Sequence, residues 1–235
     1  VEARLYTGTW GNIASRIVFG VQVVGSVAYL ADTDGFSVVN VSNPASPARL
    51  GGFDVTGYAN QVHMAGNLAY VAEHSNLRIV DVSNPAQPVL RGSYAPYGGA
   101  MSVFASGNYA YVAGWSYLDI LNATDPDHPI FISRSSDVGY VRSIQVAGSL
   151  IFVAEWQGLK ILDISNPANP TLRGRYDIAG GASWAHVVGN YAYVTASGVG
   201  LHMIDVSNPA SPFLVGRLAM AGGIAGVRVD DGLAY

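Results

Sequence analysis

The sequence has no cysteine, and only one of its twelve basic residues is a lysine, Lys160. Without cysteine there are no disulfides, no thiol nucleophile and no cysteine-ligated metal. The formal net charge is −4 and the arginines are scattered, so the chain has no basic stripe for nucleic acid or anionic lipid. No apolar run reaches the roughly 18 residues that cross a bilayer, so we expect no transmembrane segment.

The composition favours a folded chain rich in strands and turns. Half of the 235 residues are apolar, 12% are charged and 28 are glycine. Two markers then repeat in step, which predicts a repeat protein that uses residues 1–235 as a single domain. A linker of the Ser-Asn-Pro type ends at Pro44, Pro85, Pro126, Pro167 and Pro209. A strand of the Ala-Tyr-Val type places its aromatic residue at Tyr29, Tyr70, Tyr111, Phe152, Tyr193 and Tyr235.

Each unit of about 41 residues holds four short apolar runs. In the clearest unit they cover residues 62–64, 68–72, 77–82 and 89–92, and glycine, asparagine or proline separates them. Runs of this length and composition predict strands rather than helices. Residues 68–72 are apolar on both faces, as expected of a sheet that lies between neighbouring sheets. The sequence therefore predicts an all-β propeller of four-stranded blades.

The third run of the units resembles a known repeat. Residues 77–82 read Leu-Arg-Ile-Val-Asp-Val, and residues 159–164 and 201–206 are similar to them. This pattern resembles the LVIVD repeat, and the resemblance covers nearly the whole chain. It implies a β-propeller of an exported or cell-surface bacterial or archaeal protein, and it implies no catalytic residue. Asn40 and Asn122 replace the aspartate of the other units, so that carboxylate serves no chemistry required in every blade.

The ends of the chain predict the number of blades. Residues 1–9 resemble a fourth strand, and residues 223–235 resemble the first two strands of a sixth unit. We expect a six-bladed ring whose N-terminal strand closes the last blade, because closure removes exposed sheet edges. By the spacing of the repeat, roughly 16 residues of that blade are missing, so the natural chain is expected to continue past Tyr235.

The two faces of the predicted ring differ in sequence. The linkers on one face are nearly identical, which indicates a structural turn. The loops on the other face diverge and carry aromatic, acidic and amide side chains, which suit a glycan or a protein partner. Large rings also fill gaps between blades, and this role stays open. The candidate ligand-binding residues are Asp32, Glu73, His74, Trp115, Tyr140, Arg142, Glu155, Trp156 and Trp184.

A second polar set falls on the first strand of the units and is expected to line the central channel. Its members are Gln22, His63, Gln145, His186 and Arg228. His63 and His186 lie three blades apart, too far to share a zinc ion with ligand distances of about 2.0–2.1 Å. Hydrogen bonding to channel water or to adjacent blades is the favoured interpretation.

Other chemical signals are few. Residues 32–35, Asp-Thr-Asp-Gly, begin like a calcium loop but lack the glutamate that completes one, so no cofactor is expected and calcium is the only metal suggested. No Gly-x-Ser-x-Gly, His-Glu-x-x-His or phosphate-binding glycine pattern occurs, which disfavours nucleophilic and phosphoryl-transfer enzymes.

The favoured hypothesis is a non-catalytic interaction module, outside the cell or on its surface, that presents the aromatic face to a glycan or protein. A propeller hydrolase or lyase is the rival, and it needs Glu73, Glu155, His74 or Arg142 to converge at the channel mouth within roughly 5–10 Å. The third hypothesis is a scaffold segment of a larger surface or filament protein, joined to flanking domains.

Overall fold

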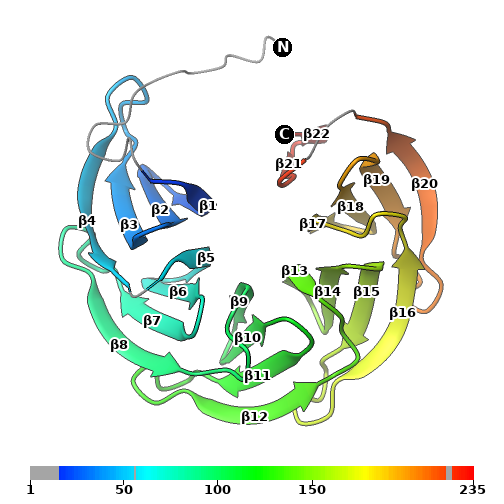
Figure 1. The fold of residues 1–235 in the computed structure, drawn as a ribbon, viewed down its shortest axis with the longest axis horizontal. Helices are drawn as coiled ribbons and strands as arrows, with labels where there is room; N and C mark the ends of the chain where they lie inside the picture. Colours follow the sequence, from blue (N-terminus) through cyan, green and yellow to red (C-terminus); the bar gives the residue numbers. More distant parts are fainter. Residues whose placement is uncertain (1–15, 56, 221–223) are drawn as a thin grey trace.

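The computed structural model describes residues 16–55, 57–220 and 224–235. Every regular element of that part is a β-strand, and it contains no helix that is long and apolar enough to cross a membrane. Strands β1 to β20 form five four-stranded antiparallel sheets, and β21 and β22 form a two-stranded sheet. Figure 1 shows these sheets arranged as blades around a central opening, with the first strand of each blade innermost and the fourth on the outer rim.

The strands follow the repeat. Blade 1 contains β1 (Val18–Val24), β2 (Val27–Asp32), β3 (Gly35–Asn40) and β4 (Ala48–Asp54). Blade 2 contains β5 (Ala59–Ala65), β6 (Leu68–Glu73), β7 (Leu77–Asp81) and β8 (Val89–Tyr94). Blade 3 contains β9 (Ser102–Ser106), β10 (Tyr109–Ala113), β11 (Leu118–Asn122) and β12 (Ile130–Ser135). Blade 4 contains β13 (Val141–Ala147), β14 (Leu150–Glu155), β15 (Gly158–Asp163) and β16 (Thr171–Asp177). Blade 5 contains β17 (Trp184–Val188), β18 (Tyr191–Ala196), β19 (Gly200–Asp205) and β20 (Phe213–Leu218), and the last sheet contains β21 (Val229–Asp230) and β22 (Leu233–Ala234).

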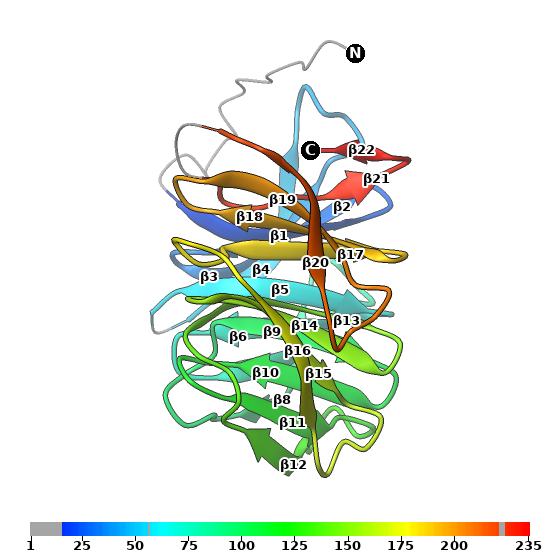
Figure 2. The ribbon, with the colours of Figure 1, turned by 90° about the vertical axis from the view of Figure 1, so that its right-hand side faces the viewer.

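Each blade is twisted, as sheets of L-amino acids are. Figure 2 shows β17, β18 and β19 running nearly level while β20 is steeply inclined across the rim. The tight turn between the first two strands contains a glycine with a positive φ, such as Gly66 at 59°, which residues with side chains rarely adopt. The chain therefore reverses directly from the first strand into the second. The second strand lies outside the first, so one strand of each blade lines the central channel.

The Ser-Asn-Pro linkers are structural turns, as the sequence predicts. In blade 2, Asn84 Oδ1 accepts a hydrogen bond from the Ala86 N–H at 3.2 Å. Just before this turn, Asp81 Oδ1 accepts one from the Ser83 N–H at 2.8 Å. In blade 1, Asn40 Oδ1 likewise accepts a hydrogen bond from the Ser42 N–H. Asparagine thus replaces aspartate because only an acceptor oxygen is needed there.

Most of the core lies between the blades. Four clusters of buried apolar side chains each combine residues of two neighbouring blades. Ile79, Ile120 and Ile161 occupy the same position of β7, β11 and β15, and all three are fully buried. Only a small fifth cluster, of Ala28, Leu30 and Val39, belongs to one blade, so each blade is stabilised mainly by its neighbours.

The short sheet of β21 and β22 continues the repeat beside blade 5. Its first strand is bound to the preceding blade, since the Val229 N–H donates to His186 Nδ1 at 3.0 Å. The all-β propeller predicted from the sequence is therefore present with five four-stranded blades and a further two-stranded sheet. The predicted closing strand at residues 1–9 lies outside the described residues.

Candidate ligand-binding site

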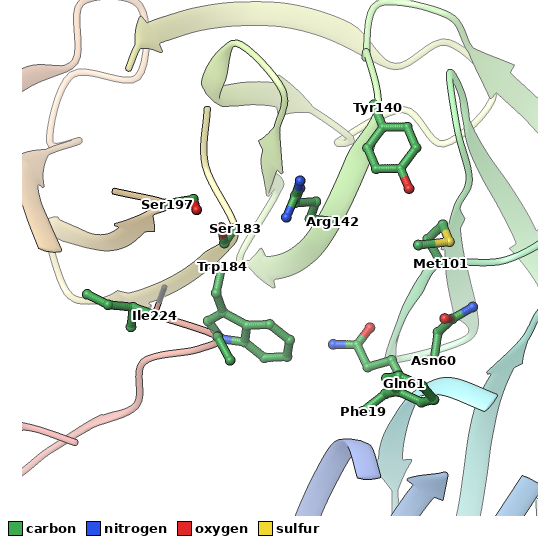
Figure 3. Close-up of a pocket in the computed structure, with 11 residues that line it drawn as sticks. Phe19, Asn60, Gln61, Met101, Tyr140, Arg142, Ser183, Trp184, Ser197 and Ile224 are labelled. Carbon is green, nitrogen blue, oxygen red and sulfur yellow. The ribbon is translucent and has the colours of Figure 1, made fainter. Parts of the chain in front are cut away.

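A pocket of about 530 Å³ lies at the mouth of the central channel, on the face opposite the linkers. We call it the central pocket, and Figure 3 shows its walls converging from different blades. Tyr140, Arg142 and Trp184, three of the residues predicted from the sequence, line it together. Its other lining residues are Phe19, Asn60, Gln61, Met101, Ser183, Ser197, Ile224 and Ala225.

The central pocket has a cationic side chain in its wall although the chain is acidic. Arg142 is exposed and is the only charged side chain among the described residues that line the pocket. Within the described part of the chain, Arg142 has no carboxylate within salt-bridge distance. Its charge therefore faces the space that a ligand would occupy.

The amide of Gln61 is held in place on the opposite wall. Its Oε1 accepts hydrogen bonds from Ser102 Oγ at 2.5 Å and from the Val103 N–H at 2.8 Å. Figure 3 shows the amide nitrogen of Gln61 on the side of the opening, across from Trp184 and Arg142. A fixed donor, a cation and two aromatic rings thus face one space.

A second pocket, of about 670 Å³, lies to the side of the central one on the same face, and we call it the lateral pocket. His74 and Trp115, two further predicted residues, line it with Ser75, Pro96, Tyr97, Gly98, Gly99, Ser116 and Tyr117. The two pockets adjoin, because the ring centroids of Trp115 and Tyr140 are 5.5 Å apart in an edge-to-face contact. The ring of His74 is oriented by Tyr58, whose hydroxyl lies 3.1 Å from Nδ1.

The three predicted carboxylates lie in the blade interior and not on the exposed face. Asp32, Glu73 and Glu155 end the second strands of their blades, and at most 4% of each is exposed. Glu73 Oε1 lies 2.7 Å from Arg78 Nε, a close ion pair whose N–H is not aligned for a hydrogen bond. Burial raises the pKa of Glu73, and Arg78 opposes that effect. These acids line neither pocket, and their surroundings indicate a structural role.

Glu155 repeats this arrangement in blade 4. Its Oε1 lies 3.4 Å from Lys160 Nζ, and its Oε2 accepts the Gly139 N–H at 2.7 Å. The acids required by the hydrolase or lyase hypothesis are thus separated from the channel mouth. His74 lies in the lateral pocket and Arg142 in the central one, so its four candidate residues are not gathered at one place.

The carboxylate of Asp32 is bound within its own turn. One of its oxygens accepts the Asp34 and Gly35 N–H groups at 2.9 and 3.0 Å, and the other accepts Ser37 Oγ at 2.8 Å. Arg16 Nη1 lies 3.4 Å away and supplies the countercharge. Among the described residues, no group of three or more acids or histidines is placed to hold a metal. Residues 32–35 therefore form a turn around Asp32 and do not fit the calcium loop suggested by the sequence.

Trp156 is joined to another candidate through the backbone, since its N–H donates to the Tyr140 carbonyl at 3.1 Å, but its side chain lines neither pocket. Trp156 is 67% exposed.

The polar residues of the first strands surround a channel cavity of about 280 Å³. All five predicted members line it: Gln22, His63, Gln145, His186 and Arg228. Each of the first four accepts one hydrogen bond, of 2.8 to 3.1 Å, from a backbone N–H of the next blade. The donors are, in the same order, Met64, Ala105, Val187 and Val229. Burial lowers the pKa of His63 to about 4, so its ring is neutral at pH 7 and Nδ1 is available as an acceptor. These contacts link adjacent blades, which is the role that sequence reasoning favoured over a metal.

Sequence reasoning did not single out Asn60, Gln61, Met101 or Ser183, although all four line the central pocket. A signal was present for Gln61. The equivalent positions of the other units are occupied by Gly20, Ser102, Ser143 and Trp184, and of these Trp184 also lines the central pocket whereas Ser102 and Ser143 are buried.

Five copies of the LVIVD repeat match residues 15–55, 56–95, 97–137, 138–178 and 179–219. They cover most of the sequence, and the chain therefore belongs to the LVIVD-repeat family. No curated protein sequence matches it significantly. A repeat identifies an architecture and not a reaction.

Solved structures agree with the fold. A putative 6-phosphogluconolactonase from Bacteroides fragilis matches with a TM-score of 0.75 and 11% identity, over 89% of this chain and 72% of its own. BamB from Moraxella catarrhalis matches with a TM-score of 0.64 and 12% identity, over 94% of this chain and 80% of its own. The computationally designed protein Ika8 matches with a TM-score of 0.70 and 8% identity, over 92% of this chain and 66% of its own. At such identities the likeness concerns the fold alone.

Proposed function

We propose that this LVIVD-repeat protein is a non-catalytic binding module that takes an acidic glycan at the central pocket. The observation that carries the proposal is the position of Arg142, the one charged side chain among the described residues lining a pocket that also presents Trp184 and Tyr140. An exported or cell-surface location, as the family resemblance implies, belongs to the same proposal.

The chemistry of the pocket favours a sugar that bears a carboxylate. Aromatic ring faces stack on the apolar faces of pyranose rings, and amide and hydroxyl groups orient the sugar hydroxyls. A guanidinium binds a carboxylate through two parallel hydrogen bonds. The lining residues include no carboxylate that would repel such a ligand. The buried, paired state of Glu73 and Glu155 supports binding rather than hydrolysis.

The test is a titration with three series of uronate oligosaccharides, from pectin, alginate and hyaluronan, followed by calorimetry. Replacing Arg142 with alanine removes the charged hydrogen bonds and is expected to weaken binding by about 1.5–3 kcal/mol, or roughly 10- to 150-fold. Arg175→Ala is the matched control, because its side chain is 59% exposed on the outer strand β16. Neutral cello-oligosaccharides are expected to bind more weakly than the uronates. Absence of binding by all three series, or equal binding to Arg142→Ala, contradicts the proposal.

The same proposal includes a ring of six blades. Two observations support it: β21 is bonded to β17 as a first strand is bonded to its predecessor, and a cavity of about 370 Å³ separates that hairpin from β1. A third strand, with residues 1–9 as the predicted fourth and closing strand, would complete the sixth blade and the ring. A crystal structure of the full-length protein tests the blade count, and a closed ring of any other number overturns it.

A further inference from the structure

We propose that the lateral pocket extends the central pocket into one binding cleft, so that the ligand is an oligosaccharide chain and not a single terminal sugar. This inference rests on the proposed function. It adds a site whose aromatic rings stack on further sugar units of the chain, beside the acidic group bound near Arg142.

Blade 3 lacks the buried acid of the repeat. Glu73 and Glu155 end the second strands of blades 2 and 4, whereas Gly114 stands at the corresponding place in blade 3. A Cβ atom on Gly114 would lie 2.4 Å from the hydroxyl of Tyr117, so this position admits no side chain while Tyr117 holds its place. In blade 3 the aromatic ring of Tyr117, a wall of the lateral pocket, lies where blades 2 and 4 hold an ion pair.

The displaced ion pair supports that wall. Asp119, one strand further out and fully buried, accepts hydrogen bonds from Arg134 Nε and Nη2 at 2.6 and 2.8 Å. The fixed guanidinium lies 4.6 Å from the ring centroid of Tyr117 and 5.9 Å from that of Tyr97. The Tyr117 hydroxyl donates to the Gly99 carbonyl at 2.8 Å, which holds the adjoining loop. Both tyrosine rings are thus oriented before a ligand arrives, which lowers the entropic cost of binding.

The exposed rings form a continuous path between the pockets. Tyr97 is 79% exposed and Trp115 is 53% exposed, and Trp115 in turn contacts Tyr140 of the central pocket. The described residues that line the lateral pocket include no carboxylate, lysine or arginine, and their hydrogen-bonding side chains are His74, Ser75, Tyr97, Trp115, Ser116 and Tyr117. Stacking rings with neutral polar groups suit uncharged faces of a sugar chain. A ligand anchored at Arg142 therefore has a prepared surface for its further units.

Tryptophan indole N–H resonances report on the two pockets separately. Trp184 lies in the central pocket, Trp115 in the lateral pocket, and exposed Trp156 in neither. Single tryptophan-to-phenylalanine variants assign the resonances in ¹⁵N-labelled protein. The probes are the dimers and hexamers of galacturonate, alginate and hyaluronan. We expect a dimer to shift Trp184 alone, a hexamer of the same series to shift Trp184 and Trp115, and neither to shift Trp156.

A tyrosine substitution measures the contribution of the lateral pocket to affinity. Tyr97→Ala is expected to weaken hexamer binding about three- to tenfold through loss of one stacking ring, and to leave dimer binding unchanged. Tyr191→Ala, at an exposed tyrosine beside the turn on the opposite face, is the matched control and should change neither. The Trp156 resonance shows that both variants remain folded.

The outcomes separate this inference from the proposed function. A hexamer that shifts Trp184 but not Trp115 overturns the extended cleft and leaves the central site intact. Shifts of Trp115 without Trp184 show two independent sites and also overturn it. If no uronate series shifts Trp184, the proposed function fails and the extension fails with it. Shifts of both reporters by a hexaglutamate peptide, with none from the glycans, assign the cleft to a protein partner and overturn both.

Discussion

The interfaces between blades and the two flanks of the array place equivalent residues in opposite environments. Val62 and Val21 occupy the same position of β5 and β1, yet Val62 is 4% exposed and Val21 is 60% exposed. On the other flank, Met203 of β19 is partly exposed where Ile161 of β15 is fully buried. The repeat therefore supplies each blade with two apolar faces, and these faces contribute to stability only where a neighbour covers them.

The largest expected effect is on the free energy of unfolding, when equivalent apolar residues are truncated at an interface between blades and on a flank of the array. Ile161→Ala leaves a cavity between blades 4 and 5 and should lower the free energy of unfolding by about 2–5 kcal/mol. Met203→Ala should cost less, about 1–2 kcal/mol, since the Met203 side chain is already partly exposed and its truncation leaves a smaller cavity. Urea unfolding followed by circular dichroism measures both values.

Equal losses of unfolding free energy in the two variants would contradict the difference between interface and flank. That result means that the flank at Met203 is covered in solution by a second copy or by another part of the chain. Sedimentation velocity distinguishes the two, because only association with a second copy depends on protein concentration.

Acid should destabilise the interior interface through His63. Burial holds the pKa of His63 at about 4 in the folded state, against 6.5 when it is exposed in the unfolded state. The unfolded state therefore binds the extra proton first, and stability falls as the pH drops from about 6.5 to about 4, by at most about 3 kcal/mol. Protonation of Nδ1 would also remove the acceptor of the Ala105 N–H. Unfolding free energies measured across this pH range test the effect.

Glutamine is a matched replacement, because Gln22 and Gln145 make the same bond in blades 1 and 4. His63→Gln should keep the stability at pH 7 and flatten its decline toward pH 4. Burial and Arg228 also lower the pKa of His186, which bonds the terminal hairpin, so His186→Gln should flatten the decline as well. An unchanged pH profile in His63→Gln means that other groups cause the loss.

The sequence predicted the architecture well because one period recurs in independent markers. The aromatic residue represented by Tyr70 and the proline represented by Pro85 recur with the same period along the chain. His63 is next to buried Val62 on one strand, and because side chains alternate along a strand, it was predicted to face the channel. These are local patterns of a repeat, and local patterns determine strands and turns. The propeller and its inter-blade polar contacts follow directly from them.

The candidate site was predicted less completely, because pocket geometry depends on contacts between blades. Glu73 and Glu155 end strands beside loops that the sequence suggests are exposed, but each forms an ion pair with a basic residue five positions further along the chain. That acid–base spacing recurs in two units and was the available signal. The lateral pocket had no local signal, since it depends on the ring of Tyr117 filling the space at Gly114. Such a replacement is visible only in three dimensions.

The smallest expected effect concerns the outer rim, where fourth strands pack on the linker of the next blade. A Cβ atom on Gly174 would lie 2.2 Å from the Pro209 carbonyl oxygen, so Gly174→Ala must move one backbone and should cost about 1–3 kcal/mol. The equivalent Gly216 has only the end of Met203 nearby, at 3.8 Å. Gly216→Ala should therefore be neutral or stabilise by up to about 1 kcal/mol, because alanine restricts the unfolded chain. Thermal unfolding compares the two variants, and an equal loss in both would show that a linker also covers the rim of blade 5.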